Sequence, residues 1–145
     1  MQIQTPKLSN SRIHHYLNLA RQACYYSDNK RTRVGCIMVY KSRVISIGYN
    51  LDKTNPLQKQ YNNLRGFDPN QSMVKNTVHA ECYSLLQTRN LDIDWRKVHV
   101  FVYRIKKDDT PGLARPCAAC EGMLRAKGIA HIYYSTDSGY GYEYY

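Results

Sequence analysis

The sequence predicts a three-layer α/β/α sandwich with a central mixed sheet of about five strands. Helical and strand-like segments follow one another in the order α-β-β-α-β-α-β, and helices that alternate with strands normally cover both faces of a sheet. The length of 145 residues suits a single domain spanning residues 1–145 and leaves no room for a second hydrophobic core.

The first part of the chain is expected to form a helix followed by a β-hairpin. Between residues 11 and 26, apolar residues recur at helical spacing. Two runs rich in β-branched residues, 34–40 and 44–49, flank a turn at Lys41–Arg43. This pattern is typical of two antiparallel strands joined by a short loop.

The stretch 50–76 is expected to be a long loop. It contains the turn-forming pairs Asn55-Pro56 and Asp68-Pro69 and shows no sustained periodicity. A structureless loop of this length in a small domain usually has a function. We therefore expect this stretch to contact the substrate.

The second half of the chain is expected to alternate helices and strands. We expect helices over 77–89 and 117–127 and strands over 98–103, 129–134 and 140–145. Pro116 suits the start of the second of these helices, and Gly128 suits its end. Residues 135–139 leave room only for a turn, so the last strand would run antiparallel to the strand before it.

Composition argues against membrane proteins and disulfide-rich secreted proteins. No run approaches the roughly 18 consecutive apolar residues of a membrane span, and Met1–Pro6 lacks the apolar core of a signal peptide. Five cysteines are too few for a disulfide scaffold in a chain of this length. We therefore expect a cytoplasmic protein without a membrane partner.

Positive charge is concentrated in the first part of the chain. Residues 1–80 carry 12 Lys and Arg against 3 Asp, whereas residues 81–145 carry 9 against 8 acidic residues. Such an excess favours a polyanionic partner, most simply nucleic acid, although a solvated surface would give the same composition. The 14 tyrosines add flat faces on which bases can stack.

Two short motifs at the starts of the predicted helices carry the chemistry. The triplet His79–Glu81 opens one helix, and the run Pro116–Cys120 opens the next. Helices that follow strands begin at the carboxyl edge of the sheet, so both motifs can reach one pocket. One imidazole and two thiolates suit Zn²⁺, and three protein ligands leave its fourth position for water. The expected ligands are His79, Cys117 and Cys120.

The combination His79-x-Glu81 and Pro116-Cys117-x-x-Cys120 resembles the signature of the zinc-dependent cytidine deaminase superfamily. This superfamily includes deoxycytidylate deaminases, tRNA adenosine deaminases and AID/APOBEC-type polynucleotide deaminases. The resemblance extends to the order of the predicted elements. It implies one zinc ion per chain, bound by the histidine and the two cysteines.

The resemblance also implies roles for residues around the metal. Glu81 would take a proton from the attacking water and deliver protons to the base and to the leaving ammonia. Asn50 would hydrogen-bond the sugar or base, and Ala80 would present its backbone to the base. On its own, Glu81 would be interpreted as favouring the helix dipole, and Asn50 as a turn residue at the end of the hairpin.

Other cysteines and histidines are expected to have no zinc role. Cys82 lies one helical turn after His79 and is an alternative ligand, but it shares an apolar stripe with Leu85 and Leu86 and fits the core better. The remaining histidines are expected to be surface or packed residues: His14, His15, His99 and His131.

Three functions fit these patterns. The favoured one is deamination of cytosine to uracil in single-stranded nucleic acid, DNA above RNA, with Tyr61 and Arg65 of the long loop contacting the strand. The alternative is a deoxycytidylate-type nucleotide deaminase in which Lys53, Lys59 or Arg65 holds one 5′-phosphate. Adenine is a less favoured base. The third function, a catalytically silent zinc-bearing module that binds nucleic acid, is disfavoured because Glu81 is intact.

Overall fold

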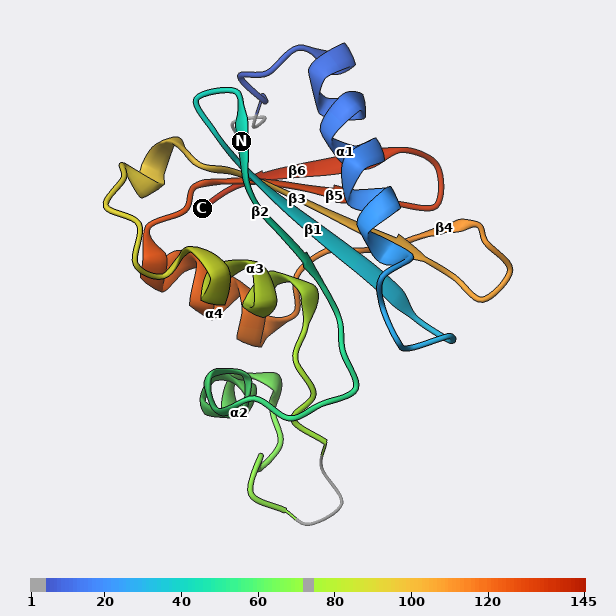
Figure 1. Ribbon diagram of the computed structural model, residues 1–145, viewed down its shortest axis with the longest axis vertical. Coiled ribbons are helices and arrows are strands. Elements are labelled where there is room, and N and C mark those ends of the chain that lie inside the picture. The colour runs from blue at the N-terminus through green and yellow to red at the C-terminus, as the bar shows by residue number, and fades with distance from the viewer. Residues whose placement is uncertain (1–4, 72–74) are drawn as a thin grey trace.

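A mixed β-sheet forms the centre of the protein, with one helix on one face and two on the other (Figure 1). The computed structural model describes residues 5–71 and 75–145. The three-layer α/β/α prediction is confirmed.

The helices and strands follow one another along the chain with these bounds: α1 Asn10–Cys24, β1 Arg33–Tyr40, β2 Arg43–Tyr49, α2 Pro56–Asn62, α3 Ala80–Thr88, β3 His99–Ile105, β4 Pro111–Gly112, α4 Ala118–Lys127, β5 His131–Ser135 and β6 Tyr140–Tyr144. Two short 3-10 helices, η1 and η2, cover Asn63–Arg65 and Trp95–Lys97.

The strands lie in the order β2-β1-β3-β5-β6, and the short β4 pairs with β3. Strands β3 and β5 are parallel, and β1 is antiparallel to both β2 and β3. Strands β2, β3 and β5 therefore point in one direction. Helices α3 and α4 return the chain between these parallel strands, so both helices begin at the same edge of the sheet.

Helix α1 covers one face of the sheet. It begins after Ser9, whose hydroxyl accepts a hydrogen bond from the Arg12 N–H at 3.3 Å. Its apolar side, which includes Ile13 and Leu17, packs against Phe101 and other residues of the central strands. The predicted helix is confirmed, with its end two residues earlier than expected.

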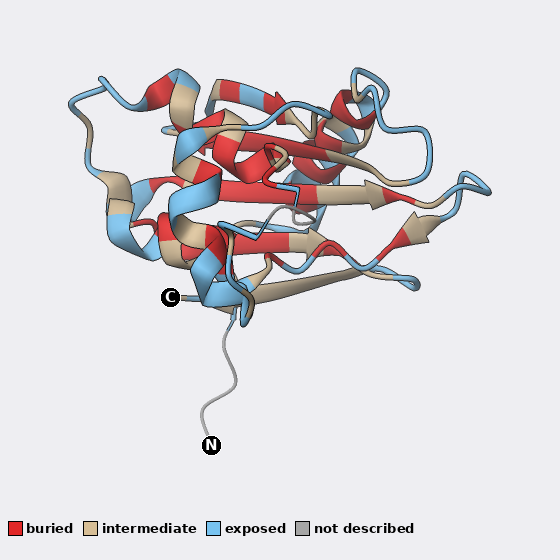
Figure 2. Cartoon of the chain, turned by 90° about the horizontal axis from the view of Figure 1, so that it is seen from below, coloured by how far each residue is buried: buried red, intermediate tan, exposed pale blue. Residues whose placement is uncertain are grey.

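Helices α3 and α4 cover the opposite face. Val100 and Val102 of β3 point to this side, because alternate residues of a strand face opposite ways, and they pack with Ile132 of β5 and Leu124 of α4. Figure 2 shows the buried residues concentrated in the central strands and the inner helical faces. A well-packed core therefore lies directly beneath the helices that carry the two motifs.

The prediction of a structureless loop over 50–76 is wrong in part. Residues 56–62 form α2, and η1 follows it. The Asn55 side chain accepts hydrogen bonds from two N–H groups of the first turn, and Pro56 occupies the start of the helix. The buried residues of this helix are the polar Gln58 and Asn62, so hydrophobic periodicity does not reveal it.

The end of the chain agrees with the predicted fifth strand. Strand β6 pairs antiparallel with β5, from Ser135 opposite Tyr140 to His131 opposite Tyr144. Strand β4 was not predicted. It adds two residues beside β3, too few for a pattern in the sequence.

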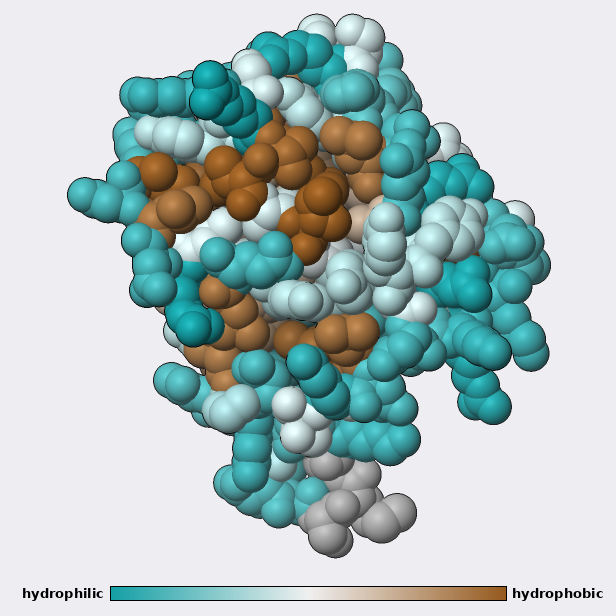
Figure 3. Space-filling view, in the orientation of Figure 1, coloured by the Kyte–Doolittle hydropathy of each residue, from teal (hydrophilic) through white to brown (hydrophobic). Residues whose placement is uncertain are grey.

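Both apolar and polar side chains are visible on the face of the molecule seen in Figure 3. In the view of Figure 3, apolar side chains gather in the middle of the face, with hydrophilic side chains around them. Two exposed apolar residues, Val44 and Ile47, lie on the edge strand β2. Within the described residues, no helix has the length and apolar character needed to cross a membrane.

Candidate metal centre and substrate cavity

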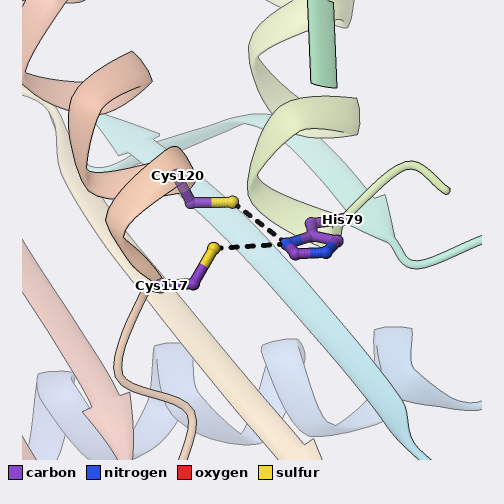
Figure 4. A group of neighbouring side chains, drawn as sticks. All are labelled: His79, Cys117 and Cys120. Atoms are coloured by element: carbon purple, nitrogen blue, oxygen red, sulfur yellow. Dashed lines mark hydrogen bonds between the residues drawn. The ribbon is translucent and has the colours of Figure 1, made fainter. Parts of the chain in front are cut away.

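The three expected zinc ligands lie at the starts of α3 and α4. His79 occupies the N-cap position of α3, Cys117 occupies the N-cap position of α4, and Cys120 lies in the first turn of α4. Both N-cap residues have extended backbone conformations, and neither side chain forms a hydrogen bond to the first turn of its own helix. The imidazole and the two thiols are therefore free to turn toward one another (Figure 4).

The geometry of these side chains fits a zinc ion. His79 Nδ1 lies 3.6 Å from Cys117 Sγ and 3.4 Å from Cys120 Sγ, and all three ligand atoms lie within 4.8 Å of one another. A zinc ion with tetrahedral geometry, about 2.1 Å from a nitrogen ligand and about 2.3 Å from a sulfur ligand, would hold that nitrogen and sulfur roughly 3.6 Å apart. Among the residues that the structure describes, the group holds three ligands, a number typical of a catalytic rather than a structural site.

The charge state of the thiols also suits a metal. Hydrogen bonding with Cys120, and then with His79, lowers the pKa of the Cys117 thiol to about 3, so this residue is a thiolate at neutral pH. The thiolate of Cys117 and burial raise the pKa of Cys120. A divalent cation would displace the remaining proton and bind both sulfurs.

Glu81 lies in the first turn of α3, two residues after His79. Its side chain is only 5% exposed, and burial raises the pKa of its carboxyl group, opposed by the charge of His79. A carboxyl group with a raised pKa beside a metal site can both accept and return a proton near neutral pH.

A cavity of about 380 Å³ opens beside these residues. It is lined by most of the residues expected at the site: Asn50, Arg65, His79, Ala80, Glu81 and Cys117. Cys120 belongs to the ligand group but lies behind the cavity wall, fully buried. The volume falls in the range of small-molecule sites.

Asn50 is held firmly at the wall of this cavity. Its Oδ1 accepts a hydrogen bond from the Val34 N–H at 2.9 Å, and its Nδ2 donates to the Thr32 carbonyl at 2.8 Å. These bonds tie the end of β2 to the start of β1. One N–H and one lone pair of the amide remain for other partners.

Tyr61 lies outside the cavity. Its ring packs over Gly122 of α4 and, with Leu57 and Met123, lines a separate apolar groove. Helix α2 turns this ring toward α4, and contact between Tyr61 and the substrate stays a prediction.

Arg104 and Arg115 line the cavity and were not predicted from the sequence. Arg115 is paired with Glu143 through two hydrogen bonds of 2.6 and 2.9 Å. The Arg104 Nε is buried and has no hydrogen-bond partner within the described residues. The charged stretch 104–115 was the available signal in the sequence, but only the pairing of β3 with β1 and β4 turns Arg104 toward the site.

The other cysteine and histidine predictions hold. Cys82 is fully buried in the core beside Leu85 and is not part of the ligand group. His14 and His15 are exposed on α1. His99 and His131 stack on each other with ring centroids 4.3 Å apart, on β3 and β5.

Comparison with known proteins agrees with this site. A family described as the cytidine and deoxycytidylate deaminase zinc-binding region matches residues 10–136. A deoxycytidylate deaminase of Mycobacterium phage D29 is 26% identical over 132 residues, 86% of this chain and 94% of the phage protein. A probable deoxycytidylate deaminase of Drosophila melanogaster is 25% identical over 118 residues, 77% of this chain. The matched region spans about half of the fly protein, at 52% of its length.

A solved structure also shares the fold. The dCMP deaminase of cyanophage S-TIM5 in its apo form superposes with a TM-score of 0.60 at 21% identity, covering 88% of this chain and 84% of the phage chain. Zinc is the cofactor that the matched family and the His79, Cys117 and Cys120 group indicate. The match over residues 10–136 establishes that the chain belongs to the cytidine and deoxycytidylate deaminase family.

Proposed function

We propose that this protein deaminates deoxycytidylate, or a closely similar cytosine nucleotide, to the uracil nucleotide with release of ammonia. In this proposal His79, Cys117 and Cys120 bind the zinc ion, and Glu81 moves the protons. The observation that supports it most strongly is the cavity beside Glu81, which carries arginine side chains in a position to hold a phosphate.

Glu81 connects the proton transfers of the reaction. A zinc ion held by His79, Cys117 and Cys120 would supply a water of lowered pKa that can attack the amino-bearing carbon at neutral pH. The Glu81 carboxylate accepts the proton of this water and passes it to the adjacent ring nitrogen. It then takes the proton of the hydroxyl group now bound to that carbon and transfers it to the amino group, so that the C–N bond breaks, ammonia leaves and the carbonyl of uracil forms.

The residues around Glu81 would orient the base. Ala80 contributes backbone to the cavity wall, and Asn50 is fixed there by its bonds to β1. A rigid wall reduces the entropy that is lost when the substrate is held in the reactive geometry.

Arg65 and Arg104 are the candidate phosphate ligands. Neither arginine forms an ion pair within the described residues, whereas Arg115 is neutralised by Glu143. Asp52 also lines the cavity but pairs with neither arginine there. Uncompensated guanidinium groups bind phosphate through charge-assisted hydrogen bonds.

The comparisons support a nucleotide substrate over the single-stranded nucleic acid expected from the charge. Both sequence relatives are described as deoxycytidylate deaminases, and the cyanophage dCMP deaminase has been crystallised with dCMP and dUMP. In addition, Arg65 lines the cavity beside Glu81, whereas Lys53 and Lys59 line other cavities.

Replacing the arginines tests the phosphate site. We expect Arg65→Gln and Arg104→Gln each to raise KM for dCMP by about 10-fold or more, because a hydrogen bond to a charged group contributes roughly 1.5–3 kcal/mol. Turnover of deoxycytidine, which lacks the phosphate, should change little. Lys59→Gln serves as the control, because Lys59 is exposed and lines another cavity. Equal effects on dCMP and deoxycytidine, or no effect on either, would remove both arginines from the proposal.

Salt dependence tests the polynucleotide function that the basic first half favours. A protein that tracks a strand should lose affinity for single-stranded DNA with a log–log slope near −0.7 per neutralised phosphate between about 50 and 200 mM salt. We expect weak, nonspecific binding and no uracil in the strand. Uracil formation in the oligonucleotide with dCMP left unchanged would favour the polynucleotide function instead.

A further inference from the structure

A chain of buried side-chain amides runs from helix α2 to the backbone of His79. Gln58 and Asn62 on α2 are 0% exposed, and Asn76, on the segment that leads into α3, is 7% exposed. Burying an amide is unfavourable unless its hydrogen bonds are replaced, so three such groups in one place need a reason.

The amides are linked in a consistent order of donors and acceptors. The Gln58 Oε1 accepts a hydrogen bond from the His79 N–H at 3.0 Å, and the Gln58 Nε2 donates to Asn62 Oδ1 at 2.9 Å. The Asn62 Nδ2 donates to Asn76 Oδ1 at 2.9 Å, and the Asn76 Nδ2 donates to the Pro69 carbonyl at 3.0 Å. Each amide therefore fixes the orientation of the previous one.

Helix α2 also has contacts with the rest of the protein that do not involve these amides. Leu57 and Tyr61 of the same helix pack against the main core, and the Asn55 side chain caps the helix start. Apolar side chains at the Gln58 and Asn62 positions would bury comparable area without the cost of desolvating amides. One end of the hydrogen-bond chain contacts the backbone of His79. This contact explains the chain better than the attachment of α2 does.

The His79 backbone is held from two sides. The preceding residue, Val78, donates its N–H to the Lys53 carbonyl at 3.0 Å and accepts from the Leu51 N–H at 3.2 Å. The His79 N–H is directed to Gln58 instead. The peptide that carries the imidazole therefore cannot rotate without breaking a bond on one side or the other.

The His79 ring has little other support. Metal-binding histidines usually donate their second ring nitrogen to a carboxylate or carbonyl, which fixes the ring. Within residues 5–71 and 75–145, the hydrogen bonds of this ring go to Cys117 and Cys120 through Nδ1, with none from the other ring nitrogen. The orientation of the imidazole consequently depends on its backbone.

We propose that Gln58 is a positioning residue for the zinc ligand His79, and that Asn62 and Asn76 keep the Gln58 amide in the orientation that accepts the His79 N–H. This inference rests on the ligand assignment made in the proposed function. It does not depend on the identity of the substrate. Loss of the Gln58 acceptor leaves a buried N–H unpaired and releases the backbone of the ligand.

The test compares Gln58→Met with Gln60→Met, because Gln60 lies on the same helix with its side chain exposed. The zinc-loaded proteins are mixed with a chelator to measure the rate of zinc release, and cobalt-substituted proteins are examined by absorption spectroscopy. We expect Gln58→Met to release zinc about 10- to 100-fold faster and to shift the cobalt bands, as is usual for residues that support a metal ligand. In the active enzyme, kcat should fall with little change in KM.

A conservative variant separates hydrogen bonding from packing. Gln58→Glu retains an oxygen that can accept the His79 N–H, so it should release zinc more slowly than Gln58→Met. If Gln58→Met does not fold, Asn62→Asp takes its place, because it removes the donor to Asn76 at nearly constant volume; it should also speed zinc release.

Several results would overturn the positioning role. These are wild-type zinc release and cobalt spectra in Gln58→Met, equal effects of Gln58→Met and Gln60→Met, or equal effects of Gln58→Met and Gln58→Glu. If Gln58→Met does not fold, wild-type behaviour of Asn62→Asp would overturn it. Zinc release and cobalt absorption need no substrate, so these readouts remain informative even if the protein fails to deaminate dCMP.

Discussion

Glu81 combines burial with a position next to the metal ligands. Because its pKa is raised and it lines the cavity, we expect Glu81→Gln to retain zinc and the fold but to lose at least about 10²-fold in kcat, the lower range for a lost general acid–base group. Zinc content and dCMP turnover are measured on the same preparation. Cys117→Ser, in contrast, should lose zinc as well as activity. Near-normal turnover in Glu81→Gln would mean that Glu81 stabilises the start of the helix and takes no part in the proton transfers.

At the scale of residues, the ligand group could be predicted because two short motifs open two helices that begin at the same edge of the sheet. His79, Cys117 and Cys120 lie at helix starts, where short motifs in the sequence largely determine the direction of the side chains. Arg104 could not be predicted in this way. Its place in the cavity follows from strand register, since Arg104 pairs with Val34 on one side and Gly112 on the other.

Helix α3 is placed by its close contact with strand β2 at Gly48. A β-carbon at Gly48 would lie 2.7 Å from the Ser84 amide nitrogen and would also clash with the Ala80 carbonyl. We therefore expect Gly48→Ala to push the start of α3 outward and to lower the free energy of unfolding by about 1–3 kcal/mol, as overpacking usually does. Urea unfolding measures this loss.

Gly139→Ala is the matched control for this contact. Gly139 has no atom within 4 Å of an added β-carbon, so the substitution should be nearly neutral. Zinc binding should weaken in Gly48→Ala only, because the start of α3 carries His79. Equal stability of the two variants would mean that β2 does not determine the position of α3.

Helix α1, whose buried residues are apolar, could be predicted, and helix α2, whose fully buried residues are polar, could not. Helix α1 was recognised because Ile13 and Leu17 recur on its buried side. Helix α2 buries Gln58 and Asn62 instead, so its pattern resembles that of a polar loop. The pair Asn55-Pro56 was the available signal, since Asn at a helix cap followed by Pro is as typical of a helix start as of a turn.

The sheet carries a stacked pair of histidines, the half-buried His99 and the buried His131, and we expect this pair to make stability depend on pH. Burial, followed by the neighbouring His131, lowers the pKa of His99 from 6.5 to about 4. Between these values the unfolded chain binds more protons than the folded protein, so the free energy of unfolding falls as the pH decreases through this window.

Unfolding experiments at several pH values test this dependence. We expect His99→Phe to flatten the loss of stability between pH 6.5 and about 4, because Phe keeps the stacking on His131 without binding a proton. His15→Phe, at an exposed position on α1, should retain the wild-type profile. Identical profiles for wild type and His99→Phe would place the origin of the pH dependence elsewhere.

At the scale of the whole molecule, the layer architecture follows from the order of elements, but the charge distribution does not identify the partner. The basic first half suggested nucleic acid, yet Lys53 and Lys59 lie outside the cavity beside Glu81. Net charge carries no information on where side chains meet in three dimensions.

The most direct test of the central claim is incubation of the zinc-loaded protein with dCMP, followed by quantification of dUMP and ammonia. We expect one ammonia for each dUMP, with activity lost on removal of zinc and restored when zinc is returned. Absence of dUMP from protein that contains one zinc per chain, or uracil formed only in single-stranded DNA, would contradict the nucleotide deaminase function.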